Sequence, residues 1–283
     1  MSLFKIQNKK QCKPYFCLMK LFSIFISFCT LLIIAGCNNS STDNNTETGS
    51  NVPTMSYSIV SILPHDTSYF TEGLEFYKGN LLESTGNYGP SKLVEVDIKT
   101  GKIIRQQPLE SKYFGEGITV LHDTLYQLTY KENTVFVYTA NDFKKIKELP
   151  YSQGEGWGMT NNGKYLIASN GTSNIYFYQP GTFKLDHVLG VTESGNAVTY
   201  INELEYINGF IYANQWETNN IYKINPSTGE VVAKMDLSDI VNKLKFTNPG
   251  IDVLNGIAYN PATNKIYITG KYWPNLYEIQ FDH

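Results

Sequence analysis

The sequence predicts an all-β protein folded as a five-bladed β-propeller, and three observations support this. First, a signature containing Glu or Asn recurs five times, at intervals of 44, 39, 48 and 52 residues, a spacing typical of stacked β units. Second, from Tyr57 onward short runs rich in Tyr, Phe, Ile and Val alternate with Gly, Asn, Asp and Pro, and no long segment keeps a helical period. Third, a strand-like run at 57–63 precedes the first signature, belongs to no repeated unit and can close the ring. The copies are Thr71-Glu72-Gly73-Leu74, Gly115-Glu116-Gly117-Ile118, Gly154-Glu155-Gly156-Trp157, Asn202-Glu203-Leu204-Glu205 and Leu254-Asn255-Gly256-Ile257.

Each of the first four units contains four strand-like runs in the same order. In the first unit we expect strands at 71–76, 80–84, 92–97 and 102–106. In the second they are at 115–120, 124–129, 134–138 and 143–148. In the third they are at 156–160, 165–169, 174–178 and 183–189, and in the fourth at 203–207, 210–214, 220–224 and 230–236. Prolines at 180 and 226 mark turns, because proline lacks the amide donor that a strand ladder needs.

The fifth unit has only three runs, at 256–260, 265–269 and 276–281. The left-over run at 57–63 can supply the missing strand, so the ring is closed by an N-terminal strand in the last blade. Such closure leaves no unpaired edge, which is how propellers avoid edge-to-edge association. A linear solenoid would need capping units, and the sequence has none.

The first 37 residues are typical of a lipoprotein signal peptide. An apolar stretch at 21–35 follows a lysine-rich segment and is too short to span a bilayer comfortably. It runs into Ile34-Ala35-Gly36-Cys37, which resembles a bacterial lipobox, whose cysteine is diacylated and becomes the new N-terminus. Both Met1 and Met19 are possible starts. We therefore expect export to the bacterial cell envelope and membrane anchoring through a lipid on Cys37.

Residues 38–53 are dominated by Asn, Ser, Thr and Gly, which suits a flexible tether and leaves 54–283 as the propeller. All four cysteines precede the tether, so the propeller can hold no disulfide, thiolate metal site or cysteine nucleophile. The first 37 residues carry five lysines and no acids, which leaves a net charge of −8 on the rest. This charge argues against nucleic acid as a partner, suits a soluble domain and would mildly attract cationic substrates. We expect a monomer.

Two sets of polar and aromatic residues are expected at one mouth of the propeller channel. In a four-stranded blade the innermost strand starts on the face where the second strand ends. The signatures contribute Glu72, Glu116, Glu155, Asn202, Glu203 and Asn255, and the ends of the second strands contribute Thr85, Tyr130, Asn170, Trp216 and Lys271. A carboxylate beside Trp157 and Trp216 matches a pocket with apolar walls and few polar groups. For Glu155, Glu203 and Asn255 a purely structural role, bonding backbone amides near the axis, stays open.

Several other chemistries are excluded by the motifs. The four histidines show no metal-ligand spacing, there is no nucleophile-elbow serine, and the Gly-Glu-Gly segments do not open helices as phosphate loops do. A Ser-His hydrolase is therefore not expected.

Longer motifs around the signatures resemble those of the glutaminyl-peptide cyclotransferases of the plant and bacterial type, the five-bladed propeller glutaminyl cyclases. The matching segments run through all five units: Phe70-Thr-Glu-Gly-Leu74, Glu83-Ser-Thr-Gly86 with Tyr88-Gly89, Phe114-Gly-Glu-Gly-Ile-Thr119, Leu125-Tyr-Gln-Leu-Thr129, Gly154-Glu-Gly-Trp-Gly158, Asn202-Glu-Leu-Glu-Tyr206, Leu254-Asn-Gly-Ile-Ala258 and Thr269-Gly-Lys271.

The resemblance implies an enzyme that converts the N-terminal glutamine of peptides and proteins to pyroglutamate and releases ammonia, without a metal or other cofactor. It implies that Glu116 is the catalytic carboxylate, assisted by Glu72, whose position is Glu or Gln in relatives. Tyr130 stands where relatives often have Trp. The expected substrate-binding residues are Trp157, Asn202, Trp216, Lys271, Tyr130 and Glu155.

The chemistry of the reaction agrees with a carboxyl group at the centre of the site. The attacking α-amine has a pKa of about 8, so freeing it at neutral pH costs only about 1 kcal/mol. The amide nitrogen leaves poorly until it is protonated, so the useful group is a carboxyl that takes the amine proton and returns it to ammonia. We expect Glu116 to be this shuttle, with a pKa raised by partial desolvation and by Glu72 and Glu155.

The other expected roles are binding and charge stabilisation. Trp157 and Trp216 would clamp the folded-back glutamine and Asn202 would hold its amide. Lys271 or a backbone amide near Gly117 would stabilise the oxyanion. Two alternatives stay open: a non-catalytic, lipid-anchored propeller that binds peptides or glycans at the same mouth, and a lactonase-like hydrolase that would need a metal cage in the channel.

Overall fold

The computed structural model describes residues 52–283. The expected signal peptide with Cys37, and the tether up to residue 51, lie outside the described residues. Within the described part of the chain, no helix is long and apolar enough to cross a membrane.

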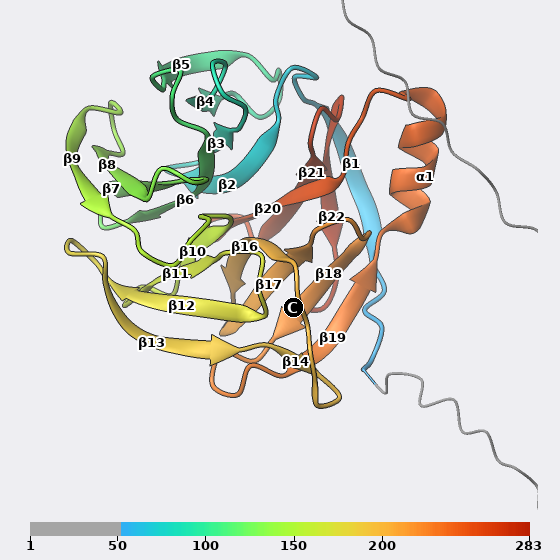
Figure 1. Ribbon diagram of the computed structural model, residues 1–283. Helices are drawn as coiled ribbons and strands as arrows, with labels where there is room; N and C mark the ends of the chain where they lie inside the picture. The colour runs from blue at the N-terminus through green and yellow to red at the C-terminus, as the bar shows by residue number, and fades with distance from the viewer. Residues whose placement is uncertain (1–51) are drawn as a thin grey trace, which may run out of the picture. The chain divides into compact units, whose positions relative to one another are not determined.

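Four-stranded antiparallel sheets are arranged around a common centre as the blades of a five-bladed propeller (Figure 1). The first blade contains β2 (Thr71–Tyr77), β3 (Asn80–Thr85), β4 (Lys92–Val96) and β5 (Ile103–Pro108). The second contains β6 (Gly115–Leu121), β7 (Thr124–Thr129), β8 (Thr134–Thr139) and β9 (Lys145–Pro150). The third contains β10 (Met159–Asn161), β11 (Leu166–Ser169), β12 (Asn174–Gln179) and β13 (Lys184–Gly190). The fourth contains β16 (Ile201–Ile207), β17 (Phe210–Gln215), β18 (Asn220–Ile224) and β19 (Val231–Asp236).

The fifth blade is closed by the N-terminal strand, as the sequence predicts. Strands β20 (Leu254–Asn260), β21 (Lys265–Gly270) and β22 (Asn275–Gln280) are completed by β1 (Ser58–Pro64), which pairs antiparallel with β22. The first and last strands of the propeller thus share one sheet, and every blade has four strands.

Two parts of the structure differ from the sequence-based expectation. The inner strand of the third blade begins at Met159, three residues later than expected. The Trp157 amide still donates to the Ser169 carbonyl of β11 (3.2 Å), but the Trp157 carbonyl accepts from the Gly117 amide of the second blade (2.7 Å). The third signature is therefore a loop that joins two blades rather than a strand.

The domain is nearly all-β, as expected, and one short helix is added that the sequence analysis did not place. Helix α1 (Ser238–Thr247) follows β19 and lies on the outside of the propeller beside β1 (Figure 1). It buries Ile240, Val241 and Leu244, a short apolar stripe that fits only two turns and gives a weak periodic signal. A small hairpin of β14 (Thr192–Glu193) and β15 (Asn196–Ala197) was also not expected.

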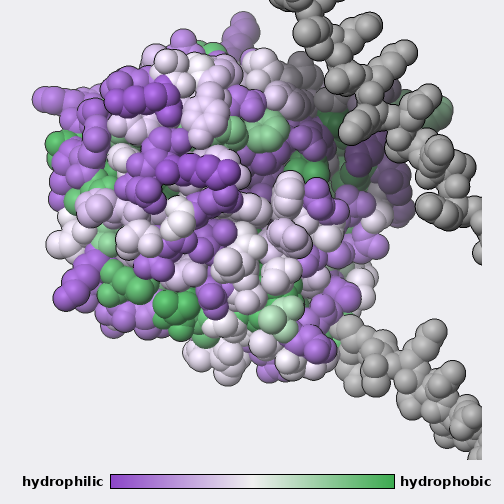
Figure 2. All heavy atoms as spheres, in the orientation of Figure 1, coloured by the Kyte–Doolittle hydropathy of each residue, from purple (hydrophilic) through white to green (hydrophobic). Residues whose placement is uncertain are grey.

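The inner strands of neighbouring blades approach one another closely, and glycine permits this. A Cβ atom on Gly73 would lie 2.7 Å from the Ile118 amide nitrogen, and one on Gly158 would lie 2.1 Å from the Asn202 carbonyl oxygen. Glycines in and directly after the signatures thus mark close backbone approach. The apolar residues that follow, such as Leu74 and Ile118, are fully buried between blades. The surface seen in Figure 2 is largely hydrophilic, with hydrophobic residues in small separate groups.

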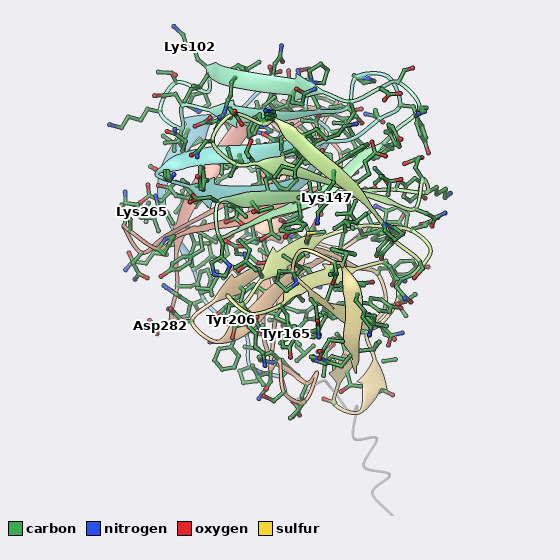
Figure 3. All side chains as sticks on the ribbon, turned by 90° about the vertical axis from the view of Figure 1, so that its left-hand side faces the viewer. Lys102, Lys147, Tyr165, Tyr206, Lys265 and Asp282 are labelled. Atoms are coloured by element: carbon green, nitrogen blue, oxygen red, sulfur yellow. The ribbon has the colours of Figure 1, made fainter. Side chains whose placement is uncertain are left out.

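The strand register brings the start of each inner strand to the end of the second strand on one face of the disc. Thr71 pairs with Thr85 in the first blade, and Leu254 pairs with Gly270 in the fifth. The turns that join these strands lie at their opposite ends and form the other face of the disc. Lys265 and Asp282 of the fifth blade lie there, on the left-hand edge of the domain in Figure 3.

Candidate active site

Signature residues of four blades lie in β-bulges at the start of the inner strands. In the first blade the pairing register shifts between Thr71 and Gly73, and equivalent shifts occur in the second, fourth and fifth blades. A bulge adds a residue with no partner across the ladder and re-aims its side chain. The bulge residues are Glu72, Glu116 with Gly117, Asn202 with Glu203, and Asn255 with Gly256. The repeat therefore sets where polar side chains leave the ladder.

A cavity of about 440 Å³ lies at this mouth of the propeller. Four of its polar lining residues are almost fully buried, whereas two carboxylates at its rim, Glu217 and Asp252, are exposed. The cavity thus has a polar floor, aromatic walls and an acidic rim, as a small-molecule pocket requires. Seven of the residues expected from the sequence line it: Glu72, Glu116, Tyr130, Trp157, Asn202, Trp216 and Lys271. They are joined by Phe70, Phe114, Glu217, Asp252 and Val253.

Glu72 and Lys271 form a buried ion pair on the floor of the cavity. Lys271 Nζ lies 2.7 Å from Glu72 Oε1, and the ammonium also lies 4.1 Å above the Phe70 ring. Asn255 Nδ2 donates to Glu72 Oε2 (3.1 Å) and to the Thr71 carbonyl (2.9 Å). Burial raises the pKa of the Glu72 carboxyl, and the Lys271 ammonium limits that rise because it favours the charged form.

Glu116 lies in the same cavity but has a different environment. It is 4% exposed, and within residues 52–283 its carboxyl group has no hydrogen-bond partner. Burial raises the pKa of Glu116 well above its usual value, and the neighbouring Glu72 carboxylate raises it further, while Lys271 opposes the rise. Glu116 is thus a buried carboxyl group whose pKa is raised by its surroundings and whose oxygens are free for a ligand.

The indole of Trp157 forms part of the cavity wall and is held from three sides. It packs against Gly171, where a Cβ would lie 2.6 Å from the ring, and its edge meets Trp216 with the ring centroids 5.7 Å apart. Its Nε1 donates to Glu155 Oε2 (3.1 Å), and Lys131 Nζ pairs with Glu155 Oε1 (3.1 Å). The structure thus places Glu155 behind Trp157 and not among the residues that line the cavity.

Tyr130 forms the neighbouring part of the wall. Its ring lies 5.5 Å from that of Phe114, and Lys131 Nζ lies 4.4 Å from the Tyr130 ring centroid. The aromatic wall expected at this position is present. Lys131 touches both Tyr130 and Glu155, so it links two adjacent blades behind the wall.

Asn202 presents its side-chain amide to the cavity. The residue is only 3% exposed, and its backbone carbonyl accepts from Ser169 Oγ (2.7 Å). Among the described residues no group bonds its side chain, although buried amides are normally paired. A free, buried amide aimed into a cavity indicates that a ligand completes its hydrogen bonds.

Other residues expected at this mouth hold the ring together. Glu203 accepts from the Leu74 amide (3.3 Å) and the Ile257 amide (2.8 Å), which belong to two other blades. Asn255 bonds Thr71 and Glu72, as described above. Neither Thr85 nor Asn170 lines the cavity; their side chains bond Lys92 and Gln153 backbone carbonyls. The amide of Gly117, a possible oxyanion donor, is already bonded to Trp157.

Five cavity residues were not assigned from the sequence. Phe70 and Phe114 each precede the Glu of their signature by two residues, so the internal repeat could have identified them. Val253 precedes the signature residue Asn255 by the same two positions, but its residue type does not repeat. Glu217 and Asp252 lie in irregular segments, and no repeated residue type marks them as part of the cavity. Over residues 52–283 no group of three or more His, Cys, Asp or Glu side chains is placed to hold a metal ion.

Comparisons with known proteins agree with this geometry. A sequence profile described as glutamine cyclotransferase matches residues 30–281. The chain is 41% identical over 225 residues to the glutaminyl-peptide cyclotransferase of Arabidopsis thaliana, an alignment that covers 78% of this chain and 70% of the plant protein. The crystal structure of Myxococcus xanthus glutaminyl cyclase superposes with a TM-score of 0.76 at 35% identity, over 82% of this chain and 98% of the other. With its whole propeller matched in sequence and in structure, the chain belongs to the glutamine cyclotransferase family.

Proposed function

We propose that this cavity binds the N-terminal glutamine of peptides and proteins and converts it to pyroglutamate with release of ammonia. The observation that carries the proposal is Glu116, a buried carboxyl group with a raised pKa and free oxygens among aromatic walls. Family membership supports the reaction, an acyl transfer of the aminoacyltransferase type. The carboxyl group supports the way in which it proceeds.

Glu116 is proposed to carry one proton between two nitrogens of the substrate. The free α-amine attacks the side-chain carbonyl carbon and forms the ring carbon–nitrogen bond. The ring nitrogen then has one proton too many, and the amide nitrogen has one too few to leave as ammonia. Glu116 takes the first proton and delivers it to the second nitrogen, and the old carbon–nitrogen bond breaks. A carboxyl pKa raised toward that of the amine keeps both transfers nearly balanced in free energy.

The remaining cavity residues are proposed to fold the substrate and stabilise charge. The rings of Trp157 and Trp216, whose centroids lie 5.7 Å apart, would select the folded-back conformer of the substrate glutamine. In this conformer the α-amine already faces the side-chain carbonyl. The free Asn202 amide would hold the substrate's backbone or side-chain amide. Lys271 keeps donors beyond its bond to Glu72, so its ammonium would stabilise the tetrahedral oxyanion. Glu72 assists by holding Lys271 in place.

The proposal is tested with a glutamine-initiated peptide and the purified protein, with and without a chelator. We expect one ammonia per peptide, a product lighter by the mass of ammonia, and no effect of the chelator. Glu116→Gln is expected to lower kcat by at least about 100-fold while circular dichroism stays unchanged. Near-normal turnover by this variant would rule out the shuttle. Binding of the peptide without ammonia release would favour the non-catalytic propeller, and loss of activity with chelator would favour a metal enzyme.

We also propose that the enzyme acts in the bacterial cell envelope as a monomer anchored by a lipid on Cys37. The support for the anchor is the sequence alone: the apolar stretch that follows a lysine-rich segment, the lipobox and the polar tether. Full-length protein expressed in a bacterium should partition into detergent and incorporate labelled fatty acid, and Cys37→Ser should abolish both. Detergent partition of Cys37→Ser would contradict the anchor, and a dimer in size-exclusion chromatography of residues 54–283 would contradict the monomer.

A further inference from the structure

We propose that Tyr200 and Glu217 form a second subsite, which takes the residue after the N-terminal glutamine and favours a cationic side chain there. The inference rests on the proposed function. It adds a substrate class, glutamine-initiated peptides with Lys or Arg at the second position. It also adds two residues that determine specificity and do not act on the glutamine itself.

The burial of the cavity residues shows where the peptide chain must leave. Glu72, Glu116, Asn202 and Lys271 are each no more than 6% exposed, so this side of the cavity is closed. Glu217 is exposed, and it follows directly on Trp216 of the wall. A peptide whose first residue contacts the unpaired Asn202 amide and the Trp216 ring therefore passes Glu217 as it reaches solvent.

Tyr200 stands beside this exit with its ring in the open. It is 49% exposed, and its ring contacts that of Trp216 with the centroids 5.7 Å apart. Two backbone hydrogen bonds hold it there: its amide donates to the Gly171 carbonyl (2.8 Å), and its carbonyl accepts from the Trp216 amide (2.9 Å). An exposed aromatic ring in a fixed place is a suitable surface for a peptide side chain, including a cationic one.

The charge at the exit explains the preference for a cation. Several other carboxylates at or near the cavity have a partner: Glu72 pairs with Lys271, Glu155 with Lys131, and Glu132 accepts from the Tyr88 hydroxyl. In the described part of the chain, Glu217 has no ion pair or side-chain hydrogen bond. An exposed, unpaired carboxylate beside an aromatic ring complements Lys or Arg and repels Asp or Glu.

Asp252, the other exposed rim carboxylate, provides a comparison. Its Oδ1 accepts from the neighbouring Val253 amide (2.8 Å), and it belongs to the segment that leads into the fifth blade, whereas Tyr200 and Glu217 flank strands of the fourth. If only the total negative charge of the rim mattered, Asp252 and Glu217 would contribute alike. The subsite requires Glu217 to contribute more.

The test compares kcat/KM for peptides that differ only at the second residue, Lys or Glu, with glutamine amide as a substrate that has no second side chain. The full-length protein is expected to favour the Lys peptide about tenfold at low salt, and this ratio should fall in 1 M salt. Glu217→Gln should reduce the ratio to about threefold or less. Tyr200→Ala should lower kcat/KM for the Lys peptide several-fold, and Tyr200→Phe should restore it, because the ring and not the hydroxyl makes the contact.

Glu230→Gln is the matched control, because Glu230 is exposed on the opposite face in the turn before β19. It should leave the ratio unchanged. Turnover of glutamine amide without discrimination between the two peptides would overturn the subsite and leave the proposed function intact. The subsite would also be overturned if Asp252→Asn, and not Glu217→Gln, removed the preference. Absence of turnover of every glutamine substrate would instead contradict the proposed function.

Discussion

Lys271 Nζ lies 2.7 Å from Glu72 Oε1, and both side chains are more than nine-tenths buried, although they come from the fifth and first blades. The two residues lie 199 positions apart in the sequence and become neighbours because the ring closes. The pair therefore links the two ends of the propeller at the floor of the cavity. Among residues 52–283, Glu116 is then the buried cavity carboxyl without a basic partner, which separates the roles of the two buried acids.

Lys271→Met is expected to destabilise the domain, because it leaves the Glu72 carboxylate buried without its counter-ion. We expect the free energy of unfolding in urea at pH 8 to fall by about 3 kcal/mol. Glu72→Gln in the same background should recover much of this loss, since a neutral amide needs no counter-ion. Equal stability of Lys271→Met and the unaltered protein would mean that the pair contributes little to holding the ring closed.

The hydrogen bond from Trp157 to Glu155 is expected to matter for catalysis through the position of the indole. Glu155→Ala removes the acceptor at 3.1 Å and should lower kcat/KM on a glutamine peptide by about tenfold. Glu155→Gln keeps an acceptor oxygen and should stay within about threefold of the unaltered enzyme. A direct contact between Glu155 and substrate predicts instead that both variants lose activity alike, so the two values of kcat/KM distinguish the roles.

Gly158→Ala should be strongly destabilising, because its Cβ would lie 2.1 Å from the Asn202 carbonyl oxygen of the next blade. The inner strands would have to separate, at a cost of about 3 kcal/mol. Gly190→Ala is the matched control at the exposed end of β13, where a Cβ meets only the Asn174 side chain at 4.0 Å. It should change the free energy of unfolding by less than about 0.5 kcal/mol. Similar thermal midpoints for both variants would contradict the close-approach argument.

Stability is expected to fall as the pH rises from about 5 to 8, because buried carboxyls on the inner strands favour their protonated form. Burial raises the pKa of Glu75 to about 7, and burial together with Glu75 raises the pKa of Glu205. The folded state then binds more protons than the unfolded chain above the ordinary carboxyl pKa, so deprotonation favours unfolding. The thermal midpoint should be higher at pH 5.5 than at pH 8.

Glu205→Gln tests the origin of this slope. The Gln oxygen can still accept from the Tyr259 amide, as Glu205 Oε1 does at 2.7 Å, but it cannot ionise. The variant should therefore lose less stability than the unaltered protein between pH 5.5 and 8. An unchanged pH dependence would show that other groups cause the slope.

Much of the fold could be predicted because propeller blades repeat local patterns. The alternation of apolar runs and turns placed the strands to within a few residues, and the left-over run before Thr71 correctly predicted the closing strand β1. The late start of β10 and the helix α1 could not be predicted in this way. The first depends on hydrogen bonds to another blade, and the second on a stripe of only three buried residues.

The sequence by itself determined the fold class, the closure of the ring and the set of polar residues at one mouth, because each follows from a local period of strands and turns. Only the tertiary structure decided which members of the repeated signature reach the cavity. Glu116 and Asn202 face it unpaired, Glu203 bonds amides of two other blades, and Glu155 lies behind Trp157. The five signatures are alike along the chain, but bulges, loop exits and contacts between blades distant in sequence give each one a different environment.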